Sequence, residues 1–276
     1  MKTGIPFSLK GAEFRYPSAT ENTLSALDLE IRPGEWVAIL GPNGSGKTTL
    51  MKMLNALLIP TQGICFVDGD NTSNSDFVIP IRSKVSMVFQ NPEDQIVSAI
   101  VEEDVAFGPE NIGLKPEIIR FRVKEALENA ELWEKHKEPV SSLSGGQKQR
   151  LALAGAFAMQ PKALLLDEAL SMLDSYSKNE IIKLISEEHK KGMTIVQVTH
   201  RLDDILYADR VVVLESGKVV CDEPIFEFLS KSEEKLRSMK FKKPSVSILR
   251  EILIKKKIIS EEIKSDIYSI KEALCR

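Results

Sequence analysis

Residues 41–48 read Gly41-Pro42-Asn43-Gly44-Ser45-Gly46-Lys47-Thr48, and they lie between an apolar run and a helix with an apolar stripe. The upstream run, WVAIL at residues 36–40, is typical of a buried parallel strand. Downstream, apolar residues at three- and four-residue spacing predict a helix that ends at Pro60. The strand, the glycine loop and the helix therefore come in the order that a phosphate-binding loop requires.

The chemistry of this loop suits a polyphosphate. Small residues let successive backbone N–H groups curl around the anion, and the helix beginning at Lys47 directs the positive end of its dipole at it. Lys47 adds a mobile charge for the β- and γ-phosphates, and Thr48 offers a hydroxyl to Mg²⁺. A chance match in a chain of this length has a probability on the order of one per cent. The strand and helix context lowers that probability further.

Length and composition narrow the class of protein. A chain of 276 residues can bury a proper core as one large domain, or as one domain with an appendage. Its cysteines, Cys65, Cys221 and Cys275, form no C-x-x-C pair, so neither a disulfide framework nor a zinc site is indicated, and a reducing cytosol is expected. Eighteen apolar residues never run together, so we expect any membrane role to be exercised from outside the bilayer.

The charge distribution is uneven. The net charge is -3, which gives no reason to expect nucleic acid as a partner. From Lys231 onward there are 13 Lys and Arg against 7 Asp and Glu, so this tail carries +6 and residues 1–230 carry -9. Because no aromatic residues interleave with the lysines, a solvated or partner-facing surface is favoured over a nucleic-acid site.

Three further apolar runs end in polar residues. In chain order these residues are Gln90, the pair Asp167 and Glu168, and His200. The carboxyl ends of parallel strands share one edge of a sheet, so we expect these side chains beside the phosphate loop. An aspartate there can hold Mg²⁺, and a neighbouring glutamate can take a proton from an attacking water. A simple helix cap is the alternative for the acidic pair. The other histidines, His136 and His189, are assigned to solvated surfaces.

The segments around these strands differ from them in residue pattern. The first 31 residues alternate like an antiparallel sheet, with Tyr16 at its edge as either a core tyrosine or a base-stacking residue. Residues 91–140 predict a helical insertion that ends at LSGGQ (143–147), which is either a second anion site or merely a capped helix start. A charged linker then leads to two terminal helices. In the last helix, Ser260 is the expected cap, and the apolar residues Ile263, Ile267, Ile270 and Leu274 form one stripe. Either its own domain or a neighbouring chain must cover that stripe.

Taken together and in this order, the motifs resemble the nucleotide-binding subunits of ABC transporters. The resemblance runs from about Phe7 to Leu229, and LSGGQ with a phosphate loop on one chain is very specific. It implies an α/β P-loop NTPase of ABC type, with a mostly parallel core sheet flanked by helices and an N-terminal antiparallel β subdomain. The ATPase domain would cover residues 1–230, with a helical subdomain inserted at about 91–150. A C-terminal helical extension, 231–276, would follow and could dimerise.

The resemblance also implies that two subunits hold ATP between them, head to tail, so that a monomer hydrolyses slowly. Glu168 would be the general base and His200 the γ-phosphate sensor, with Gln90 and Lys47 as further catalytic residues. Thr48, Gln90 and Asp167 would surround Mg²⁺. The expected nucleotide contacts are Tyr16 on adenine, Gly41, Pro42, Asn43, Gly44, Ser45, Gly46, Lys47, Thr48 and Thr49 on the phosphates, and Ser144, Gly145, Gly146, Gln147 and Asp174 from the opposite subunit. Ala169 replaces the usual proline, which predicts a looser turn after Glu168.

A narrower similarity covers QNPEDQIV at residues 90–97 and FGPEN at 107–111, which look like the ATPase of energy-coupling-factor (ECF) transporters, the group that imports vitamins, cobalt or nickel. It implies a peripheral ATPase at the cytoplasmic face of the cell membrane, paired as a homodimer or as a heterodimer with a paralogous ATPase. The pair would grip a membrane coupling protein that holds a separate substrate-binding membrane protein. The coupling helices would dock between Gln90 and Glu110.

Two alternatives stay open. One is the ATPase of an ordinary ABC importer with a dedicated binding protein. The other is a soluble ABC ATPase without a transport role, although such proteins usually carry two ATPase halves and this chain has one phosphate loop and no internal repeat. The transported solute is not encoded here, because its selectivity would reside in another polypeptide.

Overall fold

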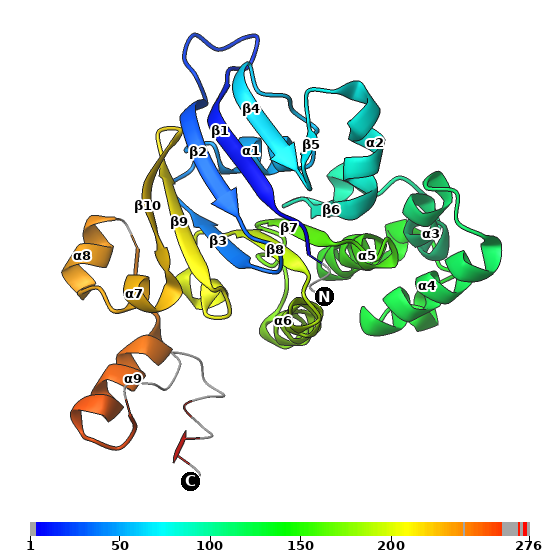
Figure 1. Ribbon diagram of the computed structural model, residues 1–276. Coiled ribbons are helices and arrows are strands. Elements are labelled where there is room, and N and C mark those ends of the chain that lie inside the picture. Colours follow the sequence, from blue (N-terminus) through cyan, green and yellow to red (C-terminus); the bar gives the residue numbers. More distant parts are fainter. Residues whose placement is uncertain (1–3, 240, 261–269, 271–272, 275–276) are drawn as a thin grey trace.

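Two β-sheets form the centre of the molecule (Figure 1). The computed structural model describes residues 4–239, 241–260, 270 and 273–274. The smaller sheet is antiparallel in the order β2-β1-β4-β5, and the larger has the order β10-β9-β3-β8-β7-β6. The strands are β1 (Phe7–Phe14), β2 (Leu24–Ile31), β3 (Trp36–Leu40), β4 (Gln62–Val67), β5 (Asp70–Asn71), β6 (Val85–Val88), β7 (Ala163–Asp167), β8 (Thr194–Val198), β9 (Arg210–Glu215) and β10 (Lys218–Pro224). The predicted antiparallel sheet before the phosphate loop is confirmed.

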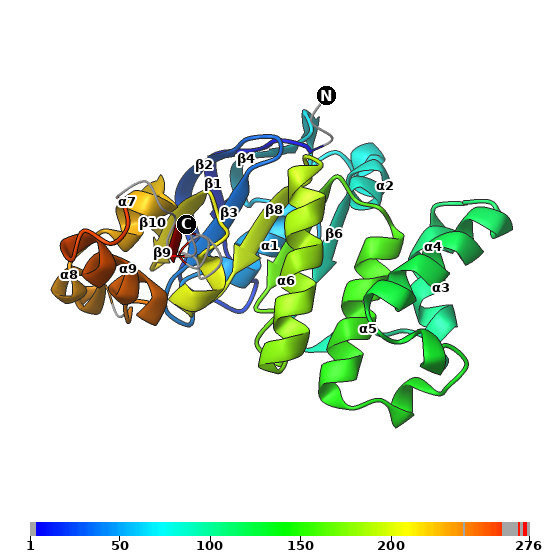
Figure 2. The same cartoon turned by 90° about the horizontal axis from the view of Figure 1, so that it is seen from below.

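Helices surround the larger sheet. They are α1 (Lys47–Leu54), α2 (Ser75–Lys84), α3 (Val101–Asn111), α4 (Pro116–Asn129), α5 (Gly145–Ala158), α6 (Ser175–Lys190), α7 (Ile225–Leu229), α8 (Glu233–Ser238) and α9 (Ser245–Lys255), with short 3-10 turns at Pro92–Asp94, Trp133–Lys135, Val140–Ser142 and Leu202–Ile205. Seen from below, α6 crosses the sheet between the group α3–α5 and the group α7–α9 (Figure 2).

The position of β3 fixes where the phosphate loop lies. This strand pairs in parallel with β8 on one side and β9 on the other, and β7 pairs in parallel with β8 and β6. Val37 and Ile39 pack into the core shared with the antiparallel sheet, whereas Trp36, Ala38 and Leu40 pack into the core beneath α6. Both faces of β3 are therefore covered, as its continuous apolar sequence predicts.

The helical insertion has a hydrophobic core of its own. Helices α3, α4 and α5 contact one another, and Val105, Leu127 and Leu151, one from each helix, are fully buried among them. The division of the chain at residues 91–150 and 231–276 stays a prediction.

Helix α2 has no counterpart in the sequence analysis. Asn74 caps it by accepting a hydrogen bond from Asp76 N at 3.0 Å, which is a usual helix start. Pro80 lies inside the helix and lacks the N–H that would bond the carbonyl four residues earlier, so its presence argues against a helix at the sequence level. Burial of Ile81 against the core nevertheless holds the helix in place.

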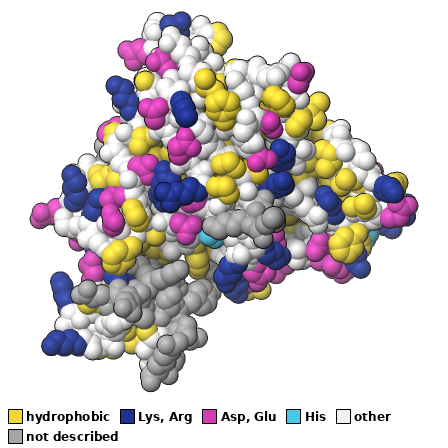
Figure 3. Space-filling view, in the orientation of Figure 1, with side chains coloured by type: hydrophobic (Ala, Val, Ile, Leu, Met, Phe, Trp, Pro, Cys, Tyr) yellow, Lys and Arg dark blue, Asp and Glu magenta, His cyan; other side chains and the backbone are white. Residues whose placement is uncertain are grey.

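The C-terminal segment is described in part. The expected apolar stripe of the last helix includes Ile263 and Ile267, which lie outside the described residues. Of its other members, Ile270 is buried and Leu274 is half exposed. Among the described residues, none of the helices combines the length and the apolar character that crossing a bilayer requires. Figure 3 shows basic and acidic side chains interspersed over one face of the molecule.

Candidate nucleotide site

The glycine loop connects β3 to α1 in a conformation that two of its glycines make possible. Gly41 and Gly46 have φ of +149° and +100°, where a side chain is strained. A Cβ on Gly41 would lie 2.2 Å from the carbonyl oxygen of Leu214, and one on Gly46 would lie 2.8 Å from that of Thr23. The loop is therefore pressed against its neighbours on one side, while its other side faces outward at the exposed Asn43.

The interior of the loop fits an anion. The Lys47 ammonium is buried and donates hydrogen bonds to the carbonyl oxygens of Gly41 and Pro42, both at 2.9 Å. Ser45 Oγ is buried and has no hydrogen-bond partner among the described residues. Burial lowers the pKa of Lys47, although the carboxylates of Glu168 and Asp167 oppose that shift. A phosphate would provide acceptors for both groups, which is the fit expected of a nucleotide loop.

Asp167 lies at the end of β7, next to the first turn of α1. It is 4% exposed, and its carboxylate is hydrogen-bonded to the Thr48 side chain. Burial raises the pKa of Asp167, and the Thr48 bond opposes the rise. A hydroxyl and a carboxylate side by side are hard oxygen ligands, which are the type that Mg²⁺ takes in proteins. The residues present therefore fit this ion.

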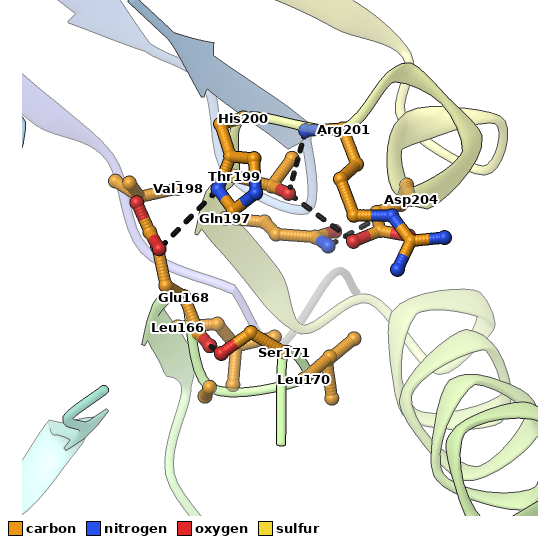
Figure 4. A pocket seen from close by; sticks show the side chains of 11 residues that line it. Leu166, Glu168, Leu170, Ser171, Gln197, Val198, Thr199, His200, Arg201 and Asp204 are labelled. Carbon is orange, nitrogen blue, oxygen red and sulfur yellow. Dashed lines mark hydrogen bonds and ion pairs between the residues drawn. The ribbon is translucent and has the colours of Figure 1, made fainter. Parts of the chain in front are cut away.

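Glu168, Gln90 and His200 meet at one carboxylate oxygen. Gln90 Nε2 donates to Glu168 Oε2 at 3.2 Å. His200 Nδ1 lies 3.4 Å from the same oxygen, as Figure 4 shows. These residues follow β6, β7 and β8, so the shared strand edge brings them together as the sequence predicts. Glu168 itself has φ of +50°, a left-handed conformation that is uncommon for a residue with a side chain.

The turn after Glu168 is closed in spite of the alanine that replaces proline. The Glu168 carbonyl accepts hydrogen bonds from Ser171 N at 3.0 Å and from Ser171 Oγ at 2.7 Å. Ala169 and Leu170 are buried. These contacts hold the turn in place without a proline, and its looseness relative to a proline-containing turn stays a prediction.

Tyr16 stands beside the phosphate-loop helix. Its hydroxyl lies 3.2 Å from Thr49 Oγ1 in α1, and its ring makes an edge contact with Phe14 at 4.9 Å between centroids. Tyr16 is therefore partly buried against the core, as expected of a core tyrosine, and it also lies next to the phosphate loop. Its stacking on adenine stays a prediction.

The LSGGQ segment begins α5 in the inserted helices. Ser144 Oγ accepts from Gln147 N at 3.3 Å, and Gln147 Oε1 accepts from Ser144 N at 2.9 Å, which forms a capping box. Gly145 and Gly146 form the first turn of the helix. These side-chain bonds stay within that turn, and both views place α5 apart from α1 (Figures 1 and 2). The structure thus does not bring LSGGQ to the phosphate loop of its own chain.

Asp174 is engaged within its own chain. It caps α6 by accepting from Tyr176 N at 2.9 Å and Ser177 N at 3.0 Å, and Ser177 Oγ donates to its other oxygen at 2.7 Å. Bonds from Ser177 lower the pKa of Asp174. The carboxylate expected to cross a subunit interface is therefore occupied as a helix cap.

His189 differs from the sequence assignment. Its ring contacts Trp36 edge-on, and its Nε2 lies 3.1 Å from the Gly34 carbonyl and 3.3 Å from Asp209. It is a packed structural histidine and not a solvated one. His136 stacks on Trp133 and bonds its carbonyl, so it too is held by the chain.

Two glutamines that the sequence analysis did not select hold the end of β6. Gln95 Oε1 accepts from Phe89 N at 3.1 Å, while Gln95 Nε2 donates to the Ala152 carbonyl in α5 at 3.2 Å. Gln149, fully buried in α5, donates to the Phe89 carbonyl at 3.3 Å. The backbone immediately before Gln90 is thereby attached to the helix that begins at LSGGQ. The sequence signal that could have revealed this role is the polar residue Gln149 on the inward face of an otherwise apolar helix.

Replacing Gln95 by leucine is expected to destabilise the fold by about 1–3 kcal/mol, because the Phe89 N–H loses its acceptor in a partly buried place. It should also lower kcat for ATP more than it changes KM, since Gln90 loses its anchor. Urea unfolding and steady-state ATPase kinetics measure both effects. Gln62→Leu, at an exposed position of β4, is the control. Equal stability and kinetics for the two variants would remove Gln95 from this role.

The fold is that of an ATP-binding cassette. The ABC transporter family matches residues 24–171, which is more than half of the chain. The ATP-binding cassette MJ0796, solved as a dimer bound to ADP and phosphate, superposes with a TM-score of 0.74 at 31% identity over 79% of this chain and 98% of that one. The chain belongs to the ATP-binding proteins of ABC transporters, which are ATPases that drive transport.

The relatives define the group more closely. The energy-coupling factor transporter ATP-binding protein EcfA1 of Clostridium perfringens is 43% identical over 95% of both chains. The cobalt import ATP-binding protein CbiO of Syntrophus aciditrophicus is 41% identical over 97% of this chain and 94% of its own. The cbiO1 structure from Clostridium perfringens, part of the transporter complex cbiONQ, has a TM-score of 0.73 at 34% identity over 89% of this chain and 98% of that one. Within the family, the chain is therefore an ATPase of the energy-coupling-factor group, which confirms the narrower motif similarity.

Proposed function

We propose that this ATPase works as a head-to-tail pair that closes around two ATP molecules and energises an importer of a vitamin or a transition-metal ion. The observation that supports the proposal is the distance between the phosphate loop and the LSGGQ segment within one chain. Lys47, Asp167 and Glu168 gather at the edge of the sheet, whereas Ser144 begins a helix in another part of the fold. A second copy, or a paralogous ATPase, would bring its own Ser144 to the first copy's γ-phosphate.

The phosphate-loop residues and the LSGGQ residues would each have a defined role in the proposed pair. The loop from Gly41 to Thr49 would hold the phosphates, and Tyr16 would stack on adenine. Thr48 and Asp167 would hold Mg²⁺ together with Gln90, and the bound ion would neutralise charge on the phosphates. Gly145, Gly146 and Gln147 would serve the partner's nucleotide. Asp174, which caps α6, would act there chiefly by shaping the interface loop.

Hydrolysis requires that one proton be removed from the attacking water. As the water oxygen attacks the γ-phosphorus and ADP leaves, Glu168 would accept that proton. Gln90 holds the same carboxylate from one side at 3.2 Å, which orients the base. His200, with about half of its side chain exposed at 56%, is free to contact the γ-phosphate from the other side.

The membrane partner would dock on the segments that flank Gln90. Exposed apolar side chains gather there along the chain, namely Phe77 and Ile79 in α2, Val97 after the 3-10 turn, and Phe107 in α3. Such side chains suit a membrane coupling protein, which would itself hold the substrate-binding protein. Because Gln95 and Gln149 attach this region to α5, closure of the ATP pair would move the docked protein.

Val97→Glu tests this docking surface. The variant should recover at least about 10-fold less integral membrane protein with the tagged full-length chain from solubilised membranes, because burial of one apolar side chain contributes about 1.5–3 kcal/mol. Val220→Glu on β10 changes a valine of similar exposure, 53% against 59%, and should recover as much as the wild type. Equal recovery with both variants would move the docking site elsewhere, and no membrane protein recovered with the wild type would refute the proposed docking to a membrane coupling protein.

A further inference from the structure

Residues 199–204, which follow β8 and include His200, are linked to α6 by a buried ion pair. Lys178 Nζ, in the first turn of α6, donates to Asp204 Oδ1, and the two side chains are 13% and 4% exposed. The other oxygen of Asp204 accepts from Thr199 Oγ1 at 3.2 Å, and Thr199 Oγ1 accepts in turn from Arg201 N at 3.2 Å. His200 lies between Thr199 and Arg201, so the Asp204 carboxylate reaches the segment that carries His200 through the Thr199 side chain (Figure 4).

The same helix begins directly after residues 171–174, which the proposed pair places at the interface between the two chains and which are called the interface loop below. Lys178 N donates to the carbonyl of Asp174 at 2.9 Å, and the Asp174 carboxylate caps α6. A continuous chain of bonds therefore runs from Asp174 through Lys178 and Asp204 to the backbone around His200. Glu168 and Ser171 line one side of a small cavity of about 10 Å³, and Thr199 and Asp204 line the other.

A contribution to the stability of the fold does not by itself explain this buried ion pair. Removing two charges from water costs several kcal/mol per ion in proteins generally, and apolar replacements of buried ion pairs are often neutral or stabilising. A charged pair is, however, directional and stiff. It suits a junction that must hold one relative position of two elements.

We propose that the Lys178–Asp204 ion pair is a positioning device that couples the loop of His200 to the interface end of α6. Because this role rests on the proposed head-to-tail pair, it has a defined consequence there. His200 would face the ATP of its own chain, while the loop ending at Asp174 would face the ATP of the other. The ion pair thus couples the two nucleotide sites, and breaking the pair removes this coupling.

The test compares the full-length wild type with Lys178→Met, Asp204→Asn and Lys178→Arg, using ATP as the probe. Breaking the pair should lower kcat at least about 10-fold, because small misplacements of reacting groups are costly, and should leave KM within about 2-fold. The proposed pair predicts a Hill coefficient for ATP above 1 in the wild type, and breaking the ion pair should lower it to 1. Lys178→Arg keeps the charge and should recover most of kcat. Lys183→Met, on the same helix in an exposed ion pair, should behave as the wild type.

Thermal stability without nucleotide, measured on the same samples, separates a positioning role from a structural one. Asp204→Asn preserves shape and an acceptor for Thr199, so it stays informative should Lys178→Met fold poorly. Lower stability with unchanged kcat, KM and Hill coefficient would show a structural pair and overturn the proposal. A wild type that hydrolyses ATP with a Hill coefficient of 1 would instead refute the proposed head-to-tail pair, and the positioning role would fall with it.

Discussion

Replacing Glu168 by glutamine is expected to reduce kcat for ATP hydrolysis by at least about 10²-fold, the lower end of what a positioned general base contributes. The amide has nearly the shape of the carboxylate and can still face Gln90 and His200, but it cannot accept a proton from water. ATP binding should persist, because the Lys47 loop is unchanged. The closed pair should therefore accumulate, and sizing with ATP should show a species of twice the mass.

Two comparisons make this result specific. Glu215→Gln, at an exposed acid at the end of β9, should hydrolyse ATP as the wild type does. With ADP in place of ATP, the Glu168→Gln chain should stay monomeric, since the γ-phosphate is what Ser144 would contact. Hydrolysis near the wild-type rate by Glu168→Gln would remove this residue from the role of base.

The second large effect is expected at the phosphate loop. Lys47→Ala should weaken ATP binding by about 2–5 kcal/mol, the range for removing one partner of a buried charged contact. That is roughly 30-fold or more in affinity. The physical reason is that the buried ammonium, held by the carbonyls of Gly41 and Pro42, is the cation inside the loop that can turn to the γ-phosphate.

The measurement for Lys47→Ala is the rise in melting temperature caused by ATP. A ligand that binds only the folded state stabilises it according to its concentration relative to Kd. The wild type should therefore show a clear rise and the variant little or none, while Lys10→Ala on β1 keeps the rise. An equal rise in all of these proteins would mean that the nucleotide binds away from this loop.

Much of the site follows from the sequence because its parts lie at the ends of parallel strands. Once Gln90, Asp167 and His200 each follow a buried apolar run, sheet geometry places them on one edge, and the structure has them there. The phosphate loop is equally local, since its glycines, its lysine and its helix are consecutive. Continuous apolar runs and the consecutive phosphate-loop motif were therefore sufficient to place these elements.

Other features depend on contacts between distant segments, which periodicity does not encode. Gln95 and Gln149 meet at the backbone of Phe89, and Lys178 meets Asp204, although each partner alone reads as an ordinary polar side chain. Asp174 caps α6 through local bonds that the sequence analysis did not foresee, and its expected position facing a partner chain stays a prediction. Helix α2 was missed because Pro80 signals a break, and tertiary packing overrides that signal.

The central claim is that each ATP site is formed by residues of two chains. The most direct measurement is the structure of the Glu168→Gln chain trapped with Mg²⁺ and ATP. We predict that Ser144 Oγ of one copy lies within hydrogen-bond distance of the γ-phosphate bound at Lys47 of another. A γ-phosphate that faces solvent, with the LSGGQ helix of every copy far from it, would contradict the account.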